Sequence, residues 1–436
     1  MTPRELAALD HQHLWHPFTQ HALWSKSDPL IIASASGCEL VDVRGDTYLD
    51  GVSSLWVGVH GHGHHRVDAA IRKQLASVAH STFLGLTHEP GILLAAALVE
   101  QTPAQLTRVF FSDSGSSAVE VALKMAFQAQ QQWGNTERTR FASLREGYHG
   151  DTLGAVSVGG IDLFHRVYEP LLFPTLQLDA PAFKEREAEL AEAAVEAIKA
   201  QGESLAALIV EPLVQGAAGM RMHSPTYLTP VLQAARDAGA LIILDEVATG
   251  FGRTGTLFAA EQLKVQPDLL CLGKGLTNGT LPLSATLASE HVFEAFVGKP
   301  EHTFFHGHTY AANPTACAAA LACLDVFDAE DTLENMPARS AFLANRLAGL
   351  AELPWVHQVR QKGLMVGVEI RQPDGAPHPP ELRFGQRICQ AIRRHGVIIR
   401  PLGDVLVLMP ALAMEEPDLD RLVRATRLGL MDTMRG

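Results

Sequence analysis

The sequence predicts an α/β protein with a mostly parallel central sheet in a large domain and a smaller α+β domain built from both termini. Short apolar runs alternate with helical patterns through the middle third of the chain. Such alternation is typical of a parallel sheet covered by helices on both faces. The chain has 436 residues, of which 47% are hydrophobic, so it can bury a large core and form more than one domain.

The middle of the chain supplies the elements of this sheet. Runs with the length and continuous apolar character of doubly buried strands span 107–112, 205–212, 240–247 and 268–273. Helical patterns span 116–133, 182–201, 224–240 and, as a long alanine-rich helix, 311–328. The third of these helices has clear start signals, because Ser224 can cap its first turn and Pro225 follows directly.

Further strand and helix signals follow residue 326 and end in an amphipathic helix that starts at Glu416. We therefore expect residues 61–325 to form the large domain. Residues 1–60 and 326–436 are expected to form the two parts of the small domain, the first of which also contacts substrate.

Charge and cysteine content exclude several classes of partner. The formal net charge of −13 disfavours nucleic acid and anionic membranes, which usually bind a basic face. The five cysteines fit neither a zinc site nor a disulfide framework, so we expect reduced thiols and a cytoplasmic location. No stretch has the pattern of a signal peptide or a membrane span. Small molecules are the expected ligands.

One lysine, Lys274, stands between Gly273 and Gly275 directly after the last of these strand-like runs. A lysine in such a pattern is most often an exposed loop residue. A lysine that forms a Schiff base must be desolvated enough to lose its proton, and it must have room to move. The two glycines leave that room.

A second motif, "LIILDEVATGFGRTG", ends a buried strand at Asp245. A carboxylate in that position needs a cationic or hydrogen-bonding partner. A protonated pyridine nitrogen is such a partner, and the carboxylate would keep it charged so that the ring can accept electrons. Asp245 and Glu246 could instead cap a helix or bind the magnesium of an ATPase, but no phosphate loop with GK[ST] precedes them.

Three further positions complete the pattern of a cofactor site. Gly115 and Ser116 open a helix directly after a strand, where N–H groups and the helix dipole favour a phosphate, although an ordinary helix cap has the same pattern. Tyr148 can stack on a ring or anchor a surface turn. Glu211 ends a strand, near the cofactor or in a salt bridge. In this chain order, the motifs describe pyridoxal phosphate at the carboxyl ends of parallel strands.

Longer motifs then connect the chain with a known family. They are "LWHPFTQ" at 14–20, "DGVSSLWVGVHGH" at 50–62, "GYHGDTLGAVSVGG" at 147–160, "DEVATGFGRTG" at 245–255, "FFHGHTYAANP" at 304–314 and "RPLGDVLVLMP" at 400–410. The chain resembles the class III, ornithine-type aminotransferases of the pyridoxal-phosphate-dependent transferase fold type I over most of its length. Within them it is most similar to the 7,8-diaminopelargonic acid aminotransferases of biotin synthesis, because of the N-terminal block and the arginine of "IIRPLG".

The resemblance implies how the cofactor is held. Lys274 would form the Schiff base with its aldehyde, and Asp245 would pair with the pyridine nitrogen. Gly115 and Ser116 would hold the phosphate. Tyr148 would stack on the ring and face the substrate.

The resemblance also implies a homodimer with active sites at its interface. His308 and Thr309 would reach the phosphate of the neighbouring subunit, and Gly307 would line the substrate pocket. Arg400 would bind the carboxylate of the substrate, a contact that suits a guanidinium group. Arg253 would assist in the same region or form an interdomain salt bridge.

The implied reaction converts 8-amino-7-oxononanoate to 7,8-diaminononanoate. Relatives that use S-adenosylmethionine as amino donor commonly have tyrosine where this chain has Phe18, and tryptophan where it has Leu55, which Trp56 follows here. Each change in an apolar pocket is worth only about 1–3 kcal/mol. S-adenosylmethionine therefore stays the expected donor, with lysine, or another class III amine aminotransferase activity, as the alternative.

The sequence also allows other interpretations of its histidine tract and of the cofactor site. The histidine-rich tract at 60–65 resembles a metal site, but it has no acidic or cysteine ligand nearby, so we expect a packed or solvated turn and no metal. A racemase, decarboxylase or mutase with the same cofactor would share Lys274 and Asp245. A binding protein without catalysis would lack the covalently attached cofactor.

Overall fold

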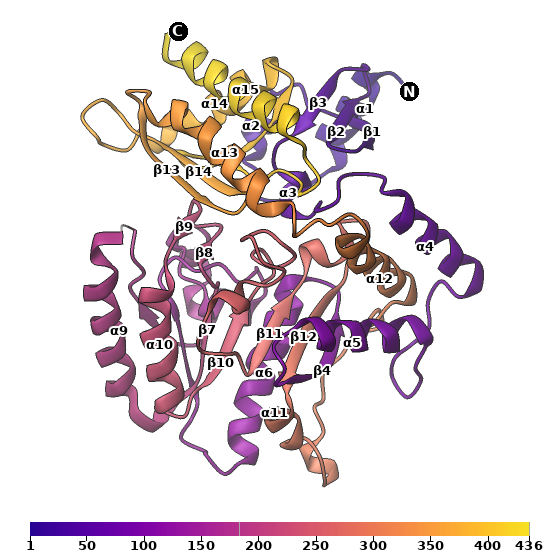
Figure 1. Ribbon diagram of the computed structural model, residues 1–436, viewed down its shortest axis with the longest axis vertical. Helices are drawn as coiled ribbons and strands as arrows, with labels where there is room; N and C mark the ends of the chain where they lie inside the picture. Colours follow the sequence, from indigo (N-terminus) through magenta and orange to yellow (C-terminus); the bar gives the residue numbers. More distant parts are fainter. Residues whose placement is uncertain (183, 436) are drawn as a thin grey trace.

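The computed structural model describes residues 1–182 and 184–435, and a seven-stranded sheet forms the centre of its larger part (Figure 1). The strand order is β4-β12-β11-β10-β7-β5-β6. Strand β12 runs antiparallel to both of its neighbours, and the pairs from β11 to β6 are all parallel. The strands are β4 (Leu106–Ser112), β5 (Arg140–Leu144), β6 (Thr175–Leu178), β7 (Leu205–Val210), β10 (Leu241–Asp245), β11 (Leu269–Leu272) and β12 (Ser284–Ser289).

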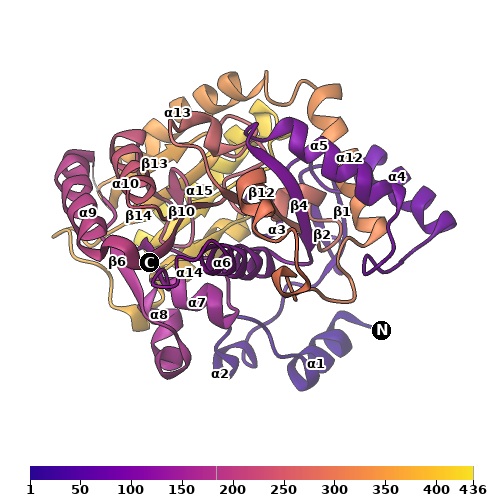
Figure 2. The ribbon, with the colours of Figure 1, turned by 90° about the horizontal axis from the view of Figure 1, so that it is seen from below.

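Helices cover both faces of this sheet (Figure 2). Successive residues of a strand point to opposite faces, and β10 shows the consequence. Leu241 and Ile243 belong to the apolar cluster of the face that α6 covers, whereas Ile242 and Leu244 belong to the cluster that includes α5, α10 and α12. The helices of this part are α4 (His65–Ser77), α5 (Glu89–Gln101), α6 (Gly115–Gln132), α7 (Leu153–Val158), α8 (Asp162–His165), α9 (Glu187–Gln201), α10 (Pro225–Asp237), α11 (Glu290–Glu294) and α12 (Pro314–Ala329).

The elements predicted for the middle of the chain are confirmed, with differences at their ends. The four predicted strands are β4, β7, β10 and β11, and Ser224 caps α10 by accepting a hydrogen bond from Thr226 N at 3.1 Å. The predicted helix at 182–201 begins only at Glu187, after a short 3-10 helix, and residue 183 lies outside the described residues. Strand β12 was not predicted because hydroxyl residues interrupt its apolar pattern; Thr286 is nevertheless buried and donates to Ala118 O at 2.8 Å.

Both ends of the chain build the smaller part, which lies at the top of Figure 1. The C-terminal strand β15 (Val397–Ile398) pairs in parallel with the N-terminal strand β3 (Thr47–Asp50), next to β2 (Glu39–Asp42) and β1 (Ile32–Ser36). A second sheet has the order β13-β14-β17-β16. Its strands are β13 (Val356–Lys362), β14 (Met365–Ile370), β16 (Arg400–Leu402) and β17 (Val405–Leu408). The domain boundaries near residues 60 and 325 stay a prediction.

The remaining elements connect or cover these sheets. The hairpin of β8 (Val214–Gln215) and β9 (Arg221–Met222) follows β7. The other helices are α1 (Pro3–His13), α2 (His21–Trp24), α3 (Ser53–Trp56), α13 (Met336–Ala351), α14 (Phe384–Arg394) and α15 (Glu416–Arg435). The 3-10 helices are η1 (Arg166–Leu171), η2 (Lys184–Arg186), η3 (Gly202–Ser204), η4 (Ala259–Gln262), η5 (Lys274–Thr277), η6 (Pro300–His302) and η7 (Pro380–Leu382). Among the helices formed by residues 1–182 and 184–435, none combines the length and apolar character that crossing a membrane requires.

Two helical glycines of the small domain have opposite surroundings. Gly429 of α15 lies against α14, and a Cβ atom on it would be 2.4 Å from Ile392 Cγ1 and 2.6 Å from the backbone nitrogen of Ile392. Gly349 of α13 has nothing within 4 Å of the same position. Only the first glycine is therefore required by a close approach of two helices.

We expect Gly429→Ala to lower the free energy of unfolding by about 1–3 kcal/mol, because the added methyl group must displace backbone as well as side-chain atoms. The matched variant Gly349→Ala should instead raise it by about 0.4–1 kcal/mol, since alanine restricts the unfolded chain. Urea unfolding followed by circular dichroism measures both. Equal effects of the two substitutions would contradict the close crossing of α14 and α15.

Candidate active site

A cavity of about 480 Å³ lies at the carboxyl ends of β7, β10 and β11 and at the first turn of α6. Ligands of open α/β sheets bind at this edge. We call it the Lys274 cavity. It is lined by Trp56, Ser114, Gly115, Ser116, Tyr148, His149, Gly150, Asp151, Thr152, Glu211, Asp245, Val247, Ala248 and Lys274. The structure thus brings together Lys274, Asp245, Tyr148, Gly115, Ser116, Glu211 and Trp56, which the sequence predicted as site residues.

Lys274 follows β11 directly and opens η5, with a backbone φ of 42°. This left-handed conformation is uncommon for a residue with a side chain and is found preferentially at functional sites. Its Nζ lies 5.4 Å from the centroid of the Trp56 ring. Burial lowers the pKa of Lys274, and the negative charges of Asp245 and Glu211 oppose this effect only in part. The amine is therefore more easily obtained in its neutral, nucleophilic form.

Asp245 is the last residue of β10 and is buried. Its Oδ2 is 2.7 Å from His149 Nδ1, and its Oδ1 accepts a hydrogen bond from Val247 N at 3.1 Å. Burial lowers the pKa of His149, but the hydrogen bond and the charge of Asp245 outweigh this, so the net pKa is raised. His149 was missed in the sequence, where only its place beside Tyr148 in "GYHGDT" marks it. A carboxylate has about four acceptor positions, so Asp245 can still accept from a ligand.

Glu246 caps a helix, which was the alternative role considered for Asp245 and Glu246. It is fully buried and accepts hydrogen bonds from Ala259 N at 2.6 Å and Ala260 N at 2.7 Å. It therefore caps η4, while its neighbour Asp245 faces the cavity. Burial raises the pKa of Glu246 to about 8. The two adjacent acids thus have separate tasks, one structural and one in the cavity.

The first turn of α6 forms the expected anion site. Ser114 caps the helix, accepting from Ser117 N at 3.2 Å, and Gly115 and Ser116 line the cavity. The N–H groups of a first turn have no partner within the helix, and the dipole attracts negative charge. A Cβ atom on Gly115 would be 2.5 Å from Val247 Cγ1, so only glycine fits against β10 here. These groups fit a phosphate.

Trp56 reaches the cavity through a strained turn. Residues Ser53, Ser54, Leu55 and Trp56 all have positive φ, between 47° and 73°. Hydrogen bonds hold the turn: Ser53 donates to Met409 O at 2.6 Å, and Ser54 donates to Asp50 Oδ2 at 2.8 Å. The turn directs Trp56 inward and leaves Leu55 48% exposed, outside the Lys274 cavity. The contact of Leu55 with substrate stays a prediction, and in this arrangement of the chain Trp56 supplies the aromatic face of the cavity.

Tyr148 and Glu211 meet at the wall of the cavity. Glu211 accepts hydrogen bonds from Tyr148 N at 3.1 Å and from Gly216 N at 3.0 Å, and the tyrosine hydroxyl donates to Asp151 Oδ2 at 2.8 Å. Within residues 1–182 and 184–435, no lysine or arginine pairs with Glu211, so it does not form the salt bridge considered as its alternative. Burial raises the pKa of Glu211 to about 7, an effect that Asp245 increases and His149 opposes.

Two predicted substrate residues, Phe18 and Arg400, line a neighbouring cavity of about 600 Å³, which we call the Arg400 cavity. Its wall includes residues 160–164, 217–219 and 400–403. Arg400 is exposed, and in the described part of the chain its guanidinium has no acidic side chain within salt-bridge distance. It is therefore free to bind an anionic group of a ligand.

Arg253 does not line either cavity. It is fully buried, and its guanidinium donates to Pro410 O at 2.5 Å and to Gly58 O at 3.0 Å. Burial lowers its pKa. The contact of Arg253 with substrate stays a prediction, and its partners in this structure are carbonyl groups rather than the acid of a salt bridge. It joins the large domain to both parts of the small domain.

The predicted residues Gly307, His308 and Thr309 also lie outside the Lys274 cavity. They belong to an extended segment on the surface, where His308 Nδ1 accepts from Tyr310 N at 3.2 Å and Nε2 lies 3.7 Å from Asp113 Oδ1. Their predicted role toward a neighbouring subunit is not tested within one chain.

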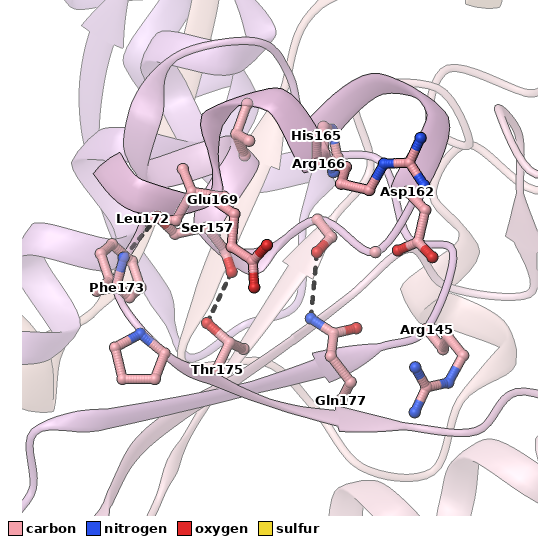
Figure 3. A pocket seen from close by; sticks show the side chains of 14 residues that line it. Arg145, Ser157, Asp162, His165, Arg166, Glu169, Leu172, Phe173, Thr175 and Gln177 are labelled. Atoms are coloured by element: carbon pink, nitrogen blue, oxygen red, sulfur yellow. Dashed lines mark hydrogen bonds between the residues drawn. The ribbon is translucent and has the colours of Figure 1, made fainter.

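A third cavity, of about 580 Å³, lies between β6 and the segment that contains α8 (Figure 3). We call it the α8 cavity. Thr175 donates to Ser157 O at 2.8 Å and Gln177 donates to Gly159 O at 3.1 Å across its wall. It contains none of the predicted site residues, but it shares Arg145, Gly160 and Asp162 with the Arg400 cavity.

The histidine-rich tract at 60–65 is a packed turn, as expected. His60 is buried and bonds to Cys323 O at 3.0 Å, whereas His62 contacts Asp50 and His64 contacts Glu330, each at 2.9 Å. The histidines thus have separate partners. In the described part of the chain, no three histidine, cysteine, aspartate or glutamate side chains converge as metal ligands.

A lysine beside a buried carboxylate and a helix N-terminus, at the carboxyl ends of a parallel sheet, is typical of enzymes that use pyridoxal phosphate. The chain belongs to the class III aminotransferase family, whose family model, described as Aminotransferase class-III, matches residues 22–427. It is 50% identical over 437 residues to an adenosylmethionine-8-amino-7-oxononanoate aminotransferase of Nitratidesulfovibrio vulgaris, an alignment that covers 97% of this chain and 81% of the relative.

Solved structures agree with this membership. The adenosylmethionine-8-amino-7-oxononanoate aminotransferase of Methanocaldococcus jannaschii is 40% identical and superposes with a TM-score of 0.95, covering 98% of this chain and 99% of that one. An amine transaminase from an uncultivated Pseudomonas species, in its PLP-bound form, is 36% identical with a TM-score of 0.91, covering 96% and 98% of the two chains. The cofactor of this chain is pyridoxal phosphate, as predicted.

The raised pKa of Glu211 predicts a pH dependence of stability. Its pKa is about 7 in the folded protein and near 4.5 in the unfolded chain, so unfolding between these pH values releases a proton. Stability from this group is present at pH 4 and is lost as the pH rises to 7, by about 3 kcal/mol. Urea unfolding of the cofactor-free proteins at pH 5 and pH 7.5 measures this loss. We expect the free energy of unfolding to fall less between these pH values in Glu211→Gln than in wild type.

Exposed Glu203, changed to glutamine, is the control for this measurement. Glu246 titrates in both proteins, so its contribution cancels in the comparison. If wild type and Glu211→Gln lose the same stability over this range, Glu211 is not the titrating group.

Proposed function

We propose that the chain transfers an amino group to 8-amino-7-oxononanoate and forms 7,8-diaminononanoate, a step of biotin synthesis, with S-adenosylmethionine as donor. The observation that carries this proposal is the 50% identity, over nearly the whole chain, to a relative named for this substrate pair. The site supports it, because the Lys274 cavity lies beside a second cavity that contains Arg400, which has no acidic partner among residues 1–182 and 184–435.

The residues of the Lys274 cavity fit pyridoxal phosphate. Gly115 and Ser116 would hold its phosphate, Asp245 would accept the pyridine N–H, and the Tyr148 ring would lie along the cofactor. When bound, pyridoxal phosphate supplies an aldehyde that takes up the amino group and a ring that stabilises negative charge on the neighbouring carbon. His149 fixes the orientation of the Asp245 carboxylate through its 2.7 Å contact. The position of these groups in the lining of the cavity supports the assignments.

Lys274 would act as both nucleophile and base. Its lowered pKa provides a neutral Nζ, which can bond to the aldehyde and, once displaced by substrate, take a proton from the amine-bearing carbon of the donor. The same Nζ would return a proton to the carbonyl carbon of the acceptor. Trp56 lies over Lys274 and keeps water from this side of the cavity. The two halves share one site, so ping-pong kinetics is expected.

The choice of donor is supported by the names of the relatives and by the position of Trp56. Leu55 lies outside the Lys274 cavity, and Trp56 provides an aromatic side chain there. Phe18 still lacks the tyrosine hydroxyl of many S-adenosylmethionine users, which keeps lysine as the second candidate.

We propose that the active unit is a homodimer in which Gly307, His308 and Thr309 complete the partner's site. Exposed apolar side chains gather on two segments that pack together through His88 Nε2 and Ala312 O, 2.7 Å apart. These side chains are Leu84, Leu86, Phe305 and Tyr310. Large exposed apolar patches commonly mark an interface between subunits.

The five free cysteines support the cytoplasmic location expected from the sequence.

The role of Lys274 and the choice of donor are tested together in single-turnover measurements. The holoenzyme is mixed with S-adenosylmethionine or with lysine, without acceptor, and the cofactor absorbance is followed. We expect S-adenosylmethionine to convert the cofactor and lysine not to do so. Lys274→Ala should slow the donor and acceptor half-reactions by about a thousandfold or more. Lys299→Ala, at an exposed position, serves as control. Conversion by lysine alone would replace the proposed donor.

Arg400→Met tests the binding of the acceptor carboxylate. Loss of a charge-assisted hydrogen bond is worth about 1.5–3 kcal/mol, so we expect KM for 8-amino-7-oxononanoate to rise about 10- to 100-fold, with kcat changed much less. The control Arg394→Met removes a guanidinium from the exposed surface of α14. An unchanged KM in Arg400→Met would place the carboxylate elsewhere.

A further inference from the structure

The Lys274 cavity and the Arg400 cavity have no lining residue in common, but an aromatic contact joins them. Phe164 of α8 lines the Arg400 cavity, and its ring centroid is 6.4 Å from that of Tyr148, at an interplanar angle of 83°. The same ring is 5.3 Å from Phe18, at 67°. Tyr148 belongs to the first cavity and Phe18 to the second. The three rings therefore form one continuous wall.

A second connection between the two cavities consists of small residues. A Cβ atom on Gly216 would lie 3.1 Å from the Trp56 ring, so Trp56 of the Lys274 cavity packs against this glycine. The next residues, Ala217 and Ala218, line the Arg400 cavity. The residues that connect the two cavities are thus aromatic rings and small side chains. Such a lining suits an unbranched alkyl chain, because the burial of each methylene group makes binding more favourable.

The helix that carries Phe164 lies between two adjoining cavities. His165 lines the α8 cavity (Figure 3), Phe164 lines the Arg400 cavity, and Asp162 lines both. His165 is buried and packs so tightly on Gly159 that a Cβ atom there would lie 2.3 Å from its ring. Gln177 fixes the same glycine through the hydrogen bond to Gly159 O. The packing of His165 against Gly159 therefore fixes the position of Phe164 from the side of the α8 cavity.

We propose that Phe164 is a specificity-determining residue that holds the alkyl chain of the acceptor between Lys274 and Arg400. This rests on the proposed function, because it assumes an acceptor with a carboxylate at one end and a reacting carbonyl at the other. The Phe164 ring selects extended, unbranched chains long enough for the carboxylate to reach Arg400 while the carbonyl reaches Lys274. It takes no part in the proton transfers, since Tyr148 lies between it and the Lys274 cavity.

The test measures binding of straight-chain carboxylates to the holoenzyme by titration calorimetry. Nonanoate and hexanoate are the probes, because they carry the carboxylate and the chain but no reacting carbonyl. In wild type, nonanoate should bind more tightly than hexanoate. In Phe164→Ala, we expect nonanoate to bind about 10-fold more weakly and the difference between the two acids to shrink. Phe164→Leu, which keeps an apolar side chain, should fall between. Val167→Ala, on the next turn and 78% exposed, should behave like wild type.

Steady-state kinetics supply the second readout. KM for 8-amino-7-oxononanoate should rise in Phe164→Ala in parallel with the dissociation constant of nonanoate, with kcat within about twofold of wild type. Unchanged binding of nonanoate in both Phe164 variants would overturn the proposal. So would a loss of chain-length dependence in Val167→Ala as large as that in Phe164→Ala. If wild type binds nonanoate through Phe164 but does not aminate 8-amino-7-oxononanoate, the proposed function fails and the chain-binding role of Phe164 stands.

Discussion

A buried carboxylate, Asp245 at the end of β10, is the constraint on which the rest of the site depends. The strand before it is buried on both faces, so its charge has to be satisfied by neighbours. His149 and the backbone of Val247 satisfy it in part. The sheet fixes where the reacting amine stands, because Asp245 pairs in register with Cys271 and Lys274 follows Cys271 by three residues. The hydrogen bonding of two parallel strands thus places Asp245 and Lys274 at one cavity.

The structure divides the chemistry from the recognition of substrate. Lys274, Asp245 and the first turn of α6 belong to the sheet edge, where the backbone is fixed by neighbouring strands. Phe164 and Arg400 come instead from α8 and from the small domain. The chemical step requires groups in fixed positions, which the edge of the sheet provides. The choice of substrate can change with loops and peripheral elements. Arg253 links the two regions through buried hydrogen bonds to Gly58 and Pro410, and so helps to set the spacing between the cavities.

The sequence was informative wherever local pattern decides the outcome. Lys274 and Asp245 could be predicted because each ends an apolar run, and Gly115 and Ser116 because a strand leads directly into a helix. His149 could not, since its partner Asp245 is 96 residues away and no local pattern connects them. The side chains at residues 55 and 56 were assigned to the pocket together, because four successive left-handed residues are not expected in a stretch without glycine. Phe164 went unnoticed because only the folded chain brings it next to both Phe18 and Tyr148.

The most direct test of this account is to locate the cofactor on the chain. The holoenzyme is reduced with borohydride, digested and analysed by mass spectrometry, which preserves a covalent bond between an amine and the cofactor. The account predicts a phosphopyridoxyl group on the peptide that contains Lys274 and on no other lysine. A modified lysine elsewhere, or an unmodified Lys274 in protein that retains its cofactor, would contradict it.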